Sequence, residues 1–428
     1  MTYLIPAVLF FGAMALGVPI AFCLGIASLT ALLFLENPVF LKIVPQMVFQ
    51  GTSMFSLMAI PFFILAGEIM NRARITQTII GFANVLVGHI RGGLAHVNIV
   101  SSIFFAGITG AAVADTAALG TILIPGMKKE GYDEDFSAAV TISSSIIGPI
   151  IPPSIVMVIY GVTMKVSIAA LFASGLLPGL IIGAALMLVA YIISIKKGFS
   201  PKPRASMAEI LSKLKDGLLG LMIPIIILGG ILSGIFTPTE AAAVGVAYGI
   251  ITGFFVFKTL KISDFPDMLR RTAITSSVVL LIIGCAKIMG WVLAYHRMPE
   301  MIAQGFLSLT DNPYLILFLI NILLLIIGMF LEISAAIVLL APILAPIAVN
   351  MGIHPLHFAI VMLVNLNIGL ITPPLGQCIF TVCSITSLKM EQVVKATLPF
   401  LLVEIAVLFL ITYFPKITAI VPELMGYY

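Results

Sequence analysis

Long apolar stretches, separated by only a few charged residues, recur along almost the whole chain and limit the folds open to it. A helix needs roughly 20 mainly apolar residues to cross a bilayer, and this chain has room for ten or more such segments. Hydrophobic residues make up 61% of the chain and charged residues only 9%, whereas soluble domains carry about a quarter charged residues. The pattern predicts an all-α protein that crosses the membrane many times and leaves no large soluble domain. The expected segments are 3–17, 18–35, 51–72, 92–127, 136–160, 168–195, 217–235, 237–258, 272–297, 313–350, 356–386 and 392–414.

Other global features exclude several classes of protein. The net charge of +4 says little about nucleic acid, because what matters in such a chain is where Lys and Arg lie relative to the spans. Membrane lipid is an expected partner, and nucleic acid is not. The start of the chain has no basic segment ahead of an apolar one and no small-residue cleavage site, so we expect it to belong to the mature protein. The four cysteines lie in apolar stretches without a metal-binding spacing, which predicts buried thiols.

One basic hydrophilic loop, residues 196–216, divides the chain. Loops rich in Lys and Arg stay in the cytoplasm, so this loop sets the expected orientation. It separates a predicted first repeat, 1–198, from a cytoplasmic loop, 199–216, and a second repeat, 217–428.

Glycines and prolines indicate that the two halves are related. A shift of 221 residues superposes 107–125 on 328–346, and the same shift superposes the proline pairs of the two halves. Matched Leu and Ile mean little in an apolar chain, but matched Gly and Pro at one offset indicate a duplication. The coinciding positions are Gly107/Gly328, Pro125/Pro346, Gly131/Gly352, Gly148/Gly369, Pro152/Pro373 and Pro153/Pro374.

Charge placement predicts that the repeats are inverted. Segments 92–127 and 313–350 are too long for one crossing, and basic residues on both sides of the first stay cytoplasmic only if it is a re-entrant hairpin. Each half then has five crossings and one hairpin, which inverts the second half, as in secondary transporters. Both termini are then expected outside. Residues 36–50 and 259–271 occupy matching places and are expected to be interfacial helices.

Each half also contains a proline pair inside a predicted span, in 136–160 and in 356–386. Proline removes a backbone donor and disfavours helix at the residue before it, so both spans are expected to be broken helices. Unwound backbone is tolerated at membrane depth only where it is buried or lines a wet cavity. Its free carbonyl groups suit a hard cation such as Na⁺.

The hairpin apices are expected near 107–116 and 328–336, where small and polar residues cluster. Asp115 and Glu332 are intramembrane carboxylates, which are functional by default, and they suit either cation attraction or local hydrogen bonding. Glu240 follows a turn that resembles a helix start, so a structural cap and a coupling role stay open for it.

Four motifs together resemble one known family: FTPTEAAAVG (236–245), GPIIPPS (148–154), GLITPPLG (369–376) and GAAVADTAALG (110–120). They look like the large, DctM-type membrane subunit of tripartite ATP-independent periplasmic (TRAP) transporters, most like the sialic-acid systems, and the resemblance covers essentially the whole chain. It implies an elevator-type fold of the ion-transporter superfamily in the bacterial inner membrane. It also implies import of an organic carboxylate, leaning to sialic acid, by symport with two or more Na⁺ ions. The implied partners are a small four-helix membrane subunit on a separate chain and a periplasmic substrate-binding protein.

The resemblance places a sodium site at the hairpin and broken helix of each half. The expected sodium ligands are Gly107, Thr109, Asp115, Ser145, Gly148, Pro149 and Pro152 in the first half, and Gly328, Glu332, Ser334, Asn367, Gly369, Thr372 and Pro373 in the second. The expected substrate-binding residues are Ser143, Ser144, Thr116 and Asn365.

Three other functions compete with this interpretation. A polytopic membrane enzyme would need a catalytic constellation, but the chain has no HExxH, no P-loop and no acidic pair facing a histidine. A channel would need a continuous pore, whereas two opposed hairpins suggest alternating access. A stand-alone Na⁺/dicarboxylate carrier is separated from the TRAP interpretation only by the family motifs.

Overall fold

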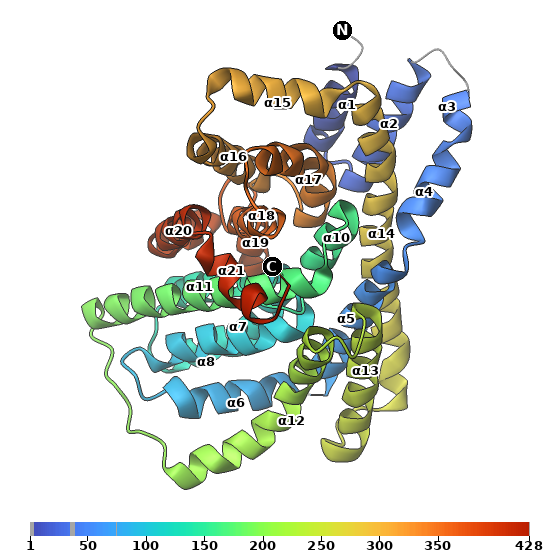
Figure 1. Cartoon of the computed structure of the whole chain (residues 1–428). Helices are drawn as coiled ribbons and strands as arrows, with labels where there is room; N and C mark the ends of the chain where they lie inside the picture. Colours follow the sequence, from blue (N-terminus) through green and yellow to red (C-terminus); the bar gives the residue numbers. More distant parts are fainter. Residues whose placement is uncertain (1–3, 35–38, 74, 428) are drawn as a thin grey trace.

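The computed structural model describes residues 4–34, 39–73 and 75–427, and every regular element in these ranges is a helix (Figure 1). The first half contains α1 (Leu4–Ala15), α2 (Ile20–Leu33), α3 (Val39–Lys42), α4 (Val44–Thr52), η1 (Phe55–Met58), α5 (Ala59–Arg72), α6 (Ile75–Val87), α7 (Gly93–Thr109), α8 (Ala112–Lys129), α9 (Glu134–Ser145), α10 (Ile155–Met164) and α11 (Ile168–Lys196). The second half contains α12 (Met207–Leu232), α13 (Pro238–Ile251), η2 (Thr252–Val256), η3 (Ile262–Asp264), α14 (Phe265–Tyr295), α15 (Met298–Leu309), α16 (Pro313–Gly328), α17 (Ile333–Asn350), α18 (Pro355–Gly369), α19 (Gln377–Ile385), α20 (Met390–Tyr413) and α21 (Lys416–Leu424).

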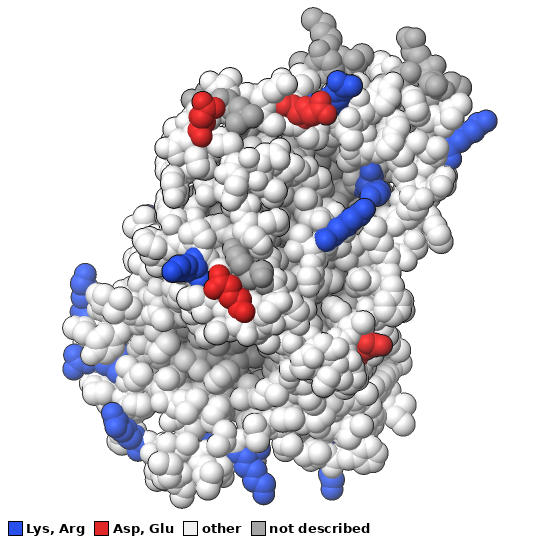
Figure 2. Space-filling model, in the orientation of Figure 1, with Lys and Arg blue, Asp and Glu red and all other residues white. Residues whose placement is uncertain are grey.

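The structure confirms an all-α membrane protein. Six helical runs among the described residues are long and apolar enough to span a bilayer. Seven shorter apolar helices also occur among the described residues, and several of them lie beside a tight turn or a break in a span. In Figure 2 uncharged residues cover most of the face shown, and Lys and Arg gather along its lower and lower-left edges, over the region of α11 and α12. A surface with so little charge suits hydrocarbon rather than water.

A repeat is visible in the order and spacing of the helices. The run α7 to α11 recurs as α16 to α20: α7 begins at Gly93 and α16 at Pro313, while α11 begins at Ile168 and α20 at Met390. Corresponding helices therefore begin 220 to 222 residues apart, close to the offset of the matched glycines and prolines. In both runs two helices form a hairpin and the next two form one interrupted span.

The two repeats interlock instead of lying side by side. Helix α10 of the first broken span packs against hairpin helix α17 of the second repeat, and α19 packs against α8 of the first. Helix α14 packs against α2, α4, α5 and α17, and in Figure 1 it runs the length of the molecule beside α2 and α4. Helix α14 therefore connects the first helices of the chain to hairpin helix α17.

Three details differ from the sequence-based expectations. Helices α6 and α15 lie outside the predicted segments, because each has only 12 or 13 residues and falls short of the length of a span. The predicted interfacial helix at 259–271 is not separate, since η3 leads directly into the 31-residue α14. The hydrophilic loop is shorter than expected, because α12 begins at Met207, where the Ser206 hydroxyl accepts a hydrogen bond from the Glu209 N–H (3.2 Å).

Candidate functional site

The first broken span is interrupted between α9 and α10 by nine residues, 146–154, all of them buried. The bond between Pro152 and Pro153 is cis. The Ser154 hydroxyl donates a hydrogen bond to the Pro149 carbonyl (2.6 Å) and accepts one from the Met157 N–H (3.3 Å). This side chain both closes the break and starts α10. The backbone carbonyls of the break are therefore held in the protein interior, as its proline pair predicts.

The apex of the first hairpin lies directly on this break. Gly110 has a positive φ of 59°, and a Cβ atom added there would come within 3.0 Å of the Pro153 carbonyl oxygen. A Cβ atom added at Gly148 would lie 2.1 Å from Oδ2 of Asp115. Asp115 itself is fully buried in α8. The two glycines thus allow a hairpin and its carboxylate to meet an unwound backbone, an arrangement of oxygens that suits a hard cation.

The remaining predicted ligands of the first half are distributed around the same contact. A Cβ atom at Gly107 would lie 3.7 Å from the Pro152 carbonyl oxygen and 2.5 Å from the Pro224 side chain. The Ser145 hydroxyl donates a hydrogen bond to the Thr141 carbonyl of the same helix (2.7 Å). The Thr109 side chain lies outside the described part of the chain. The structure therefore brings the predicted glycines, Asp115 and the break together.

The second half repeats this contact with a closer approach of the backbones. A Cβ atom added at Gly369 would lie 2.4 Å from the carbonyl carbon of Gly328 and 2.6 Å from its oxygen. Glu332 caps the N-terminus of α17, where its carboxylate accepts hydrogen bonds from the Ala335 N–H (3.1 Å) and the Ser334 hydroxyl (2.8 Å). Glu332 and Ser334 are thus mutually bonded at the hairpin apex. This supports the local hydrogen-bonding interpretation of Glu332.

Two buried side-chain oxygens of α18, near the second break, lack a hydrogen-bond donor among the described residues. Asn367 donates to the Leu363 carbonyl (2.7 Å) and Asn365 to the side chain of Asn321 (2.8 Å). The Oδ1 atoms of both asparagines are buried without a hydrogen-bond donor among the described residues. Thr372 donates to the Ile368 carbonyl (2.8 Å), and the peptide bond after Pro373 is cis. A buried acceptor without a donor is unfavourable, so these oxygens could receive a cation.

The two breaks differ in their exposure. Residues 146–154 are all buried, but Pro374 and Leu375 of the second break are exposed, Leu375 to 43%. The two repeats therefore have similar elements in different surroundings.

Three of the four predicted substrate residues form contacts within or between helices. Ser144 accepts a hydrogen bond from Ser102 of α7 (2.8 Å), within a buried network that also includes Asn98 and Thr141. Thr116 donates to the Ala112 carbonyl (2.9 Å), and Asn365 joins α18 to α16 through Asn321. Ser143 is buried, and its hydroxyl has no partner among the described residues.

A central cavity of about 250 Å³ lies where the two hairpin apices approach each other. None of the four predicted substrate residues lines it. Glu332, Ser334 and Gln377 supply polar groups from the second repeat, and Thr275 supplies a hydroxyl from α14. Its other lining residues are Ile64, Gly110, Ala111, Ala112, Val113, Pro149, Ile155, Val156, Val279, Ile333 and Leu370. Thr275 and Gln377 carry no motif, so the sequence offered no signal for them. A mainly apolar cavity with a few convergent polar groups is typical of a small-molecule site.

Glu240 lies away from this cavity, in a capping box at the start of α13. Its carboxylate accepts hydrogen bonds from the N–H and hydroxyl of Thr237 (both 2.8 Å), while the Glu240 N–H donates to the Thr237 hydroxyl (3.3 Å). We expect Glu240→Ala to lower the melting temperature of the purified protein and to leave uptake per folded molecule unchanged, because it removes only the cap. Thermal unfolding and uptake measured on the same preparation check this. Loss of uptake at an unchanged melting temperature would instead favour the coupling role.

Comparison with known proteins agrees with the family that the motifs indicate. The DctM component of the tripartite ATP-independent periplasmic transporters matches residues 7–417. The sialic acid TRAP transporter large permease protein SiaM of Vibrio cholerae is 42% identical over 97% of both chains. The C4-dicarboxylate TRAP transporter large permease protein DctM of Pseudomonas aeruginosa is 40% identical over 93% of both.

A solved structure shares the fold at much lower sequence identity. The Alcanivorax borkumensis YdaH transporter superposes with a TM-score of 0.61 at 14% identity, covering 99% of this chain and 98% of its own. The family assignment itself rests on the full-length sequence matches. This chain belongs to the DctM family, the large membrane permease component of the tripartite ATP-independent periplasmic transporters.

Proposed function

We propose that this chain imports an organic carboxylate across the bacterial inner membrane by symport with Na⁺. The observation that carries the proposal is the central cavity, because elements of both repeats line it at the two hairpin apices. Substrate sites of inverted-repeat transporters lie at the repeat interface, between discontinuous helices. The N-terminal ends of α8 and α17 lie at these apices, and the positive end of a helix dipole favours an anion.

Sodium is proposed as co-transported cargo, with one ion at the hairpin and broken helix of each half. In the first half Asp115 and the buried carbonyls of 146–154 offer a charge and neutral oxygens in one place. In the second half the Oδ1 atom of Asn367, which has no hydrogen-bond donor among the described residues, belongs to the helix that ends at Gly369. Hard cations prefer such oxygen ligands.

The proposed motion is of the elevator type. The hairpins and broken spans interlock across the two repeats, so they would move together against α14 and the helices packed on it. The exposure of one break and not the other is what a structure in one of two alternating states would show.

The proposed partners are a small membrane subunit on a separate chain and a periplasmic substrate-binding protein that delivers the acid. The chain is proposed to have no enzymatic activity. We favour sialic acid as the substrate, because the Vibrio cholerae relative named for it is 42% identical. The C4-dicarboxylate and 2,3-diketo-L-gulonate relatives, at 40% and 35%, make other carboxylates the alternatives.

Uptake by proteoliposomes tests the proposal. The chain is reconstituted with the small subunit, and a radiolabelled sialic acid, succinate or 2,3-diketo-L-gulonate is offered with its binding protein. We expect uptake only with an inward Na⁺ gradient and only with the binding protein. Equal uptake under a K⁺ gradient would contradict Na⁺ symport. Equal uptake without the binding protein would favour the stand-alone carrier.

A further inference from the structure

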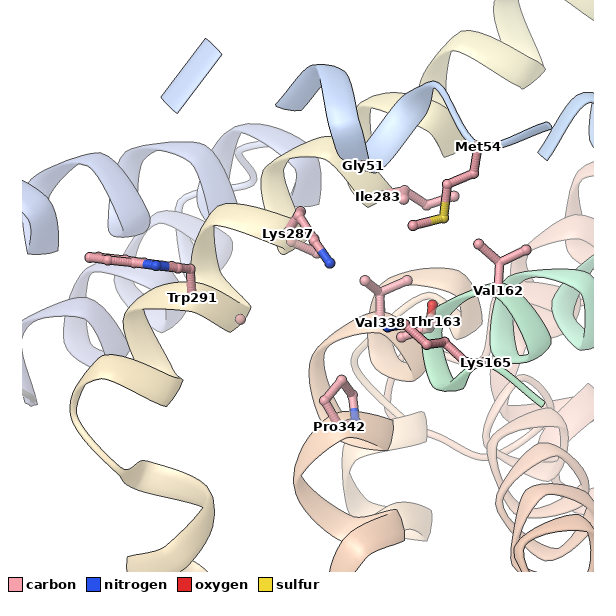
Figure 3. A pocket seen from close by; sticks show the side chains of 12 residues that line it. Gly51, Met54, Val162, Thr163, Lys165, Ile283, Lys287, Trp291, Val338 and Pro342 are labelled. Atoms are coloured by element: carbon pink, nitrogen blue, oxygen red, sulfur yellow. The ribbon is translucent and has the colours of Figure 1, made fainter. Parts of the chain in front are cut away.

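A second cavity, of about 340 Å³, contains two lysine side chains (Figure 3). Lys287, with Ile283 and Trp291 on the same face of α14, forms one wall, and Lys165 lies at the end of α10 on the opposite wall. In Figure 3 the Lys287 ammonium points across the cavity toward Val338 of α17 and the end of α10. We call this space the two-lysine cavity.

The two-lysine cavity and the central cavity both lie between α14 and α17. On α14, Val279 lines the central cavity and Ile283, four residues on, lines the two-lysine cavity. On α17 the same step leads from Ser334 to Val338. Residues four apart are neighbours on one helix face, so the cavities follow each other along the same two helices. At 1.5 Å per residue, Lys287 lies about 12 Å along α14 from Val279.

The charge of this cavity has one sign. No acidic residue lines it, and neither lysine forms an ion pair with a carboxylate in the part of the chain that the structure describes. A cation at Lys165 is favoured by the C-terminal end of α10. No helix C-terminus stabilises the charge of Lys287 in this way, because Lys287 lies eight residues before the end of α14. It is also the one charged residue of segment 272–296. An ionisable group inside a spanning segment points to a function.

We propose that the two-lysine cavity binds the carboxylate group of the transported acid before the acid enters the central cavity. Each ammonium offers three donors and no acceptor, so a carboxylate between the two walls would receive charge-assisted hydrogen bonds from both. Both lysine side chains are exposed, so an acid can reach them directly. The inference rests on the proposed function for the direction of movement, but binding itself can be measured without transport.

Trp291 makes this binding directly observable, because it is the only tryptophan of the chain and lines the two-lysine cavity. The purified full-length chain, in detergent with Na⁺, is titrated with a sialic acid, with succinate and with a neutral sugar while tryptophan fluorescence is recorded. We expect saturable changes with at least one of the two acids and none with the sugar. No change with either acid would overturn the proposal.

Substitutions identify the groups that bind. Lys287→Gln and Lys165→Gln should each raise the half-saturating acid concentration about tenfold, since each removes one charge-assisted contact, and the double variant should not respond. Lys287→Arg should stay within about threefold of the unsubstituted chain because the charge remains. Lys395→Gln, at an exposed lysine of α20 that does not line the cavity, is the matched control and should titrate normally. If Lys287→Gln fails to fold, Lys165→Gln carries the test alone; normal titration of a folded Gln variant would overturn the assignment.

A lipid phosphate could compete for the same ammonium groups. Phosphatidylglycerol is therefore titrated in a parallel arm, and a Trp291 response to this lipid with none to either acid would overturn the carboxylate assignment. Failure of this inference is distinguishable from failure of the proposed function. Na⁺-driven uptake without a Trp291 response removes only the inference. A Trp291 response without Na⁺-driven uptake removes the proposed function and the order of binding, and it leaves the two-lysine cavity as a carboxylate-binding site.

Discussion

Gly369→Ala is expected to reduce Na⁺-driven uptake to background. The added methyl group would lie 2.4 to 2.6 Å from three backbone atoms of Gly328, closer than a Cβ atom can approach. All three atoms belong to backbone and not to a flexible side chain, so relief of the clash requires the hairpin apex to move away from the broken span. Such a shift would separate the oxygens proposed to bind Na⁺ and distort the adjoining central cavity. Cores are close-packed, and overpacking them costs about 1–3 kcal/mol, so we expect a less stable protein that still reaches the membrane.

Gly126→Ala is the matched control for this experiment. Gly126 lies in hairpin helix α8, and a Cβ atom there would meet nothing within 4 Å. This variant should transport like the unsubstituted protein, and alanine should favour its helix slightly. Proteoliposome uptake and thermal unfolding of both variants are compared at equal protein. Undiminished uptake by Gly369→Ala would show that the close approach of apex and break is not needed for transport.

Asp115→Asn is expected to raise the Na⁺ concentration for half-maximal uptake at least tenfold. The substitution keeps the size of the side chain but removes the negative charge that the structure buries against the first break. A buried carboxylate beside unwound backbone attracts a cation far more strongly than an amide does, because low dielectric strengthens the interaction. The maximal rate should fall as well, if both sodium sites must fill before the hairpins move.

The measurement is the Na⁺ dependence of uptake at a saturating concentration of the carboxylate. Asp311→Asn serves as the control, because Asp311 is exposed in the turn between α15 and α16. It should leave the Na⁺ dependence unchanged. An Asp115→Asn variant with an unchanged Na⁺ dependence would remove Asp115 from the proposed sodium site and leave it a structural role.

Local sequence patterns predict most of the elements of this fold. Apolar stretches predict spans because the hydrocarbon layer requires them, and the proline pairs predict the two breaks because proline cannot continue a helix. Matched Gly and Pro at one offset predicted that α7 to α11 recur as α16 to α20. The short helices α6 and α15 were missed because a length criterion for spans does not detect helices of 12 or 13 residues.

Only the tertiary structure decided which elements meet. The polar residues beside the breaks were expected to bind substrate, yet Ser144 and Asn365 hydrogen-bond to neighbouring helices, and the central cavity is lined by Thr275, Gln377 and the two apices. Lys165 and Lys287 share a cavity although 122 residues separate them. The sequence by itself determined the all-α membrane class, the repeat and the breaks, because these follow from local propensity and hydrophobicity. The pairing of each apex with its own break was implied only by the family resemblance, and it becomes visible in the packing. The central cavity and the two-lysine cavity depend on how α10, α14 and α17 pack across the repeats. Packing between distant segments leaves no local pattern in the sequence.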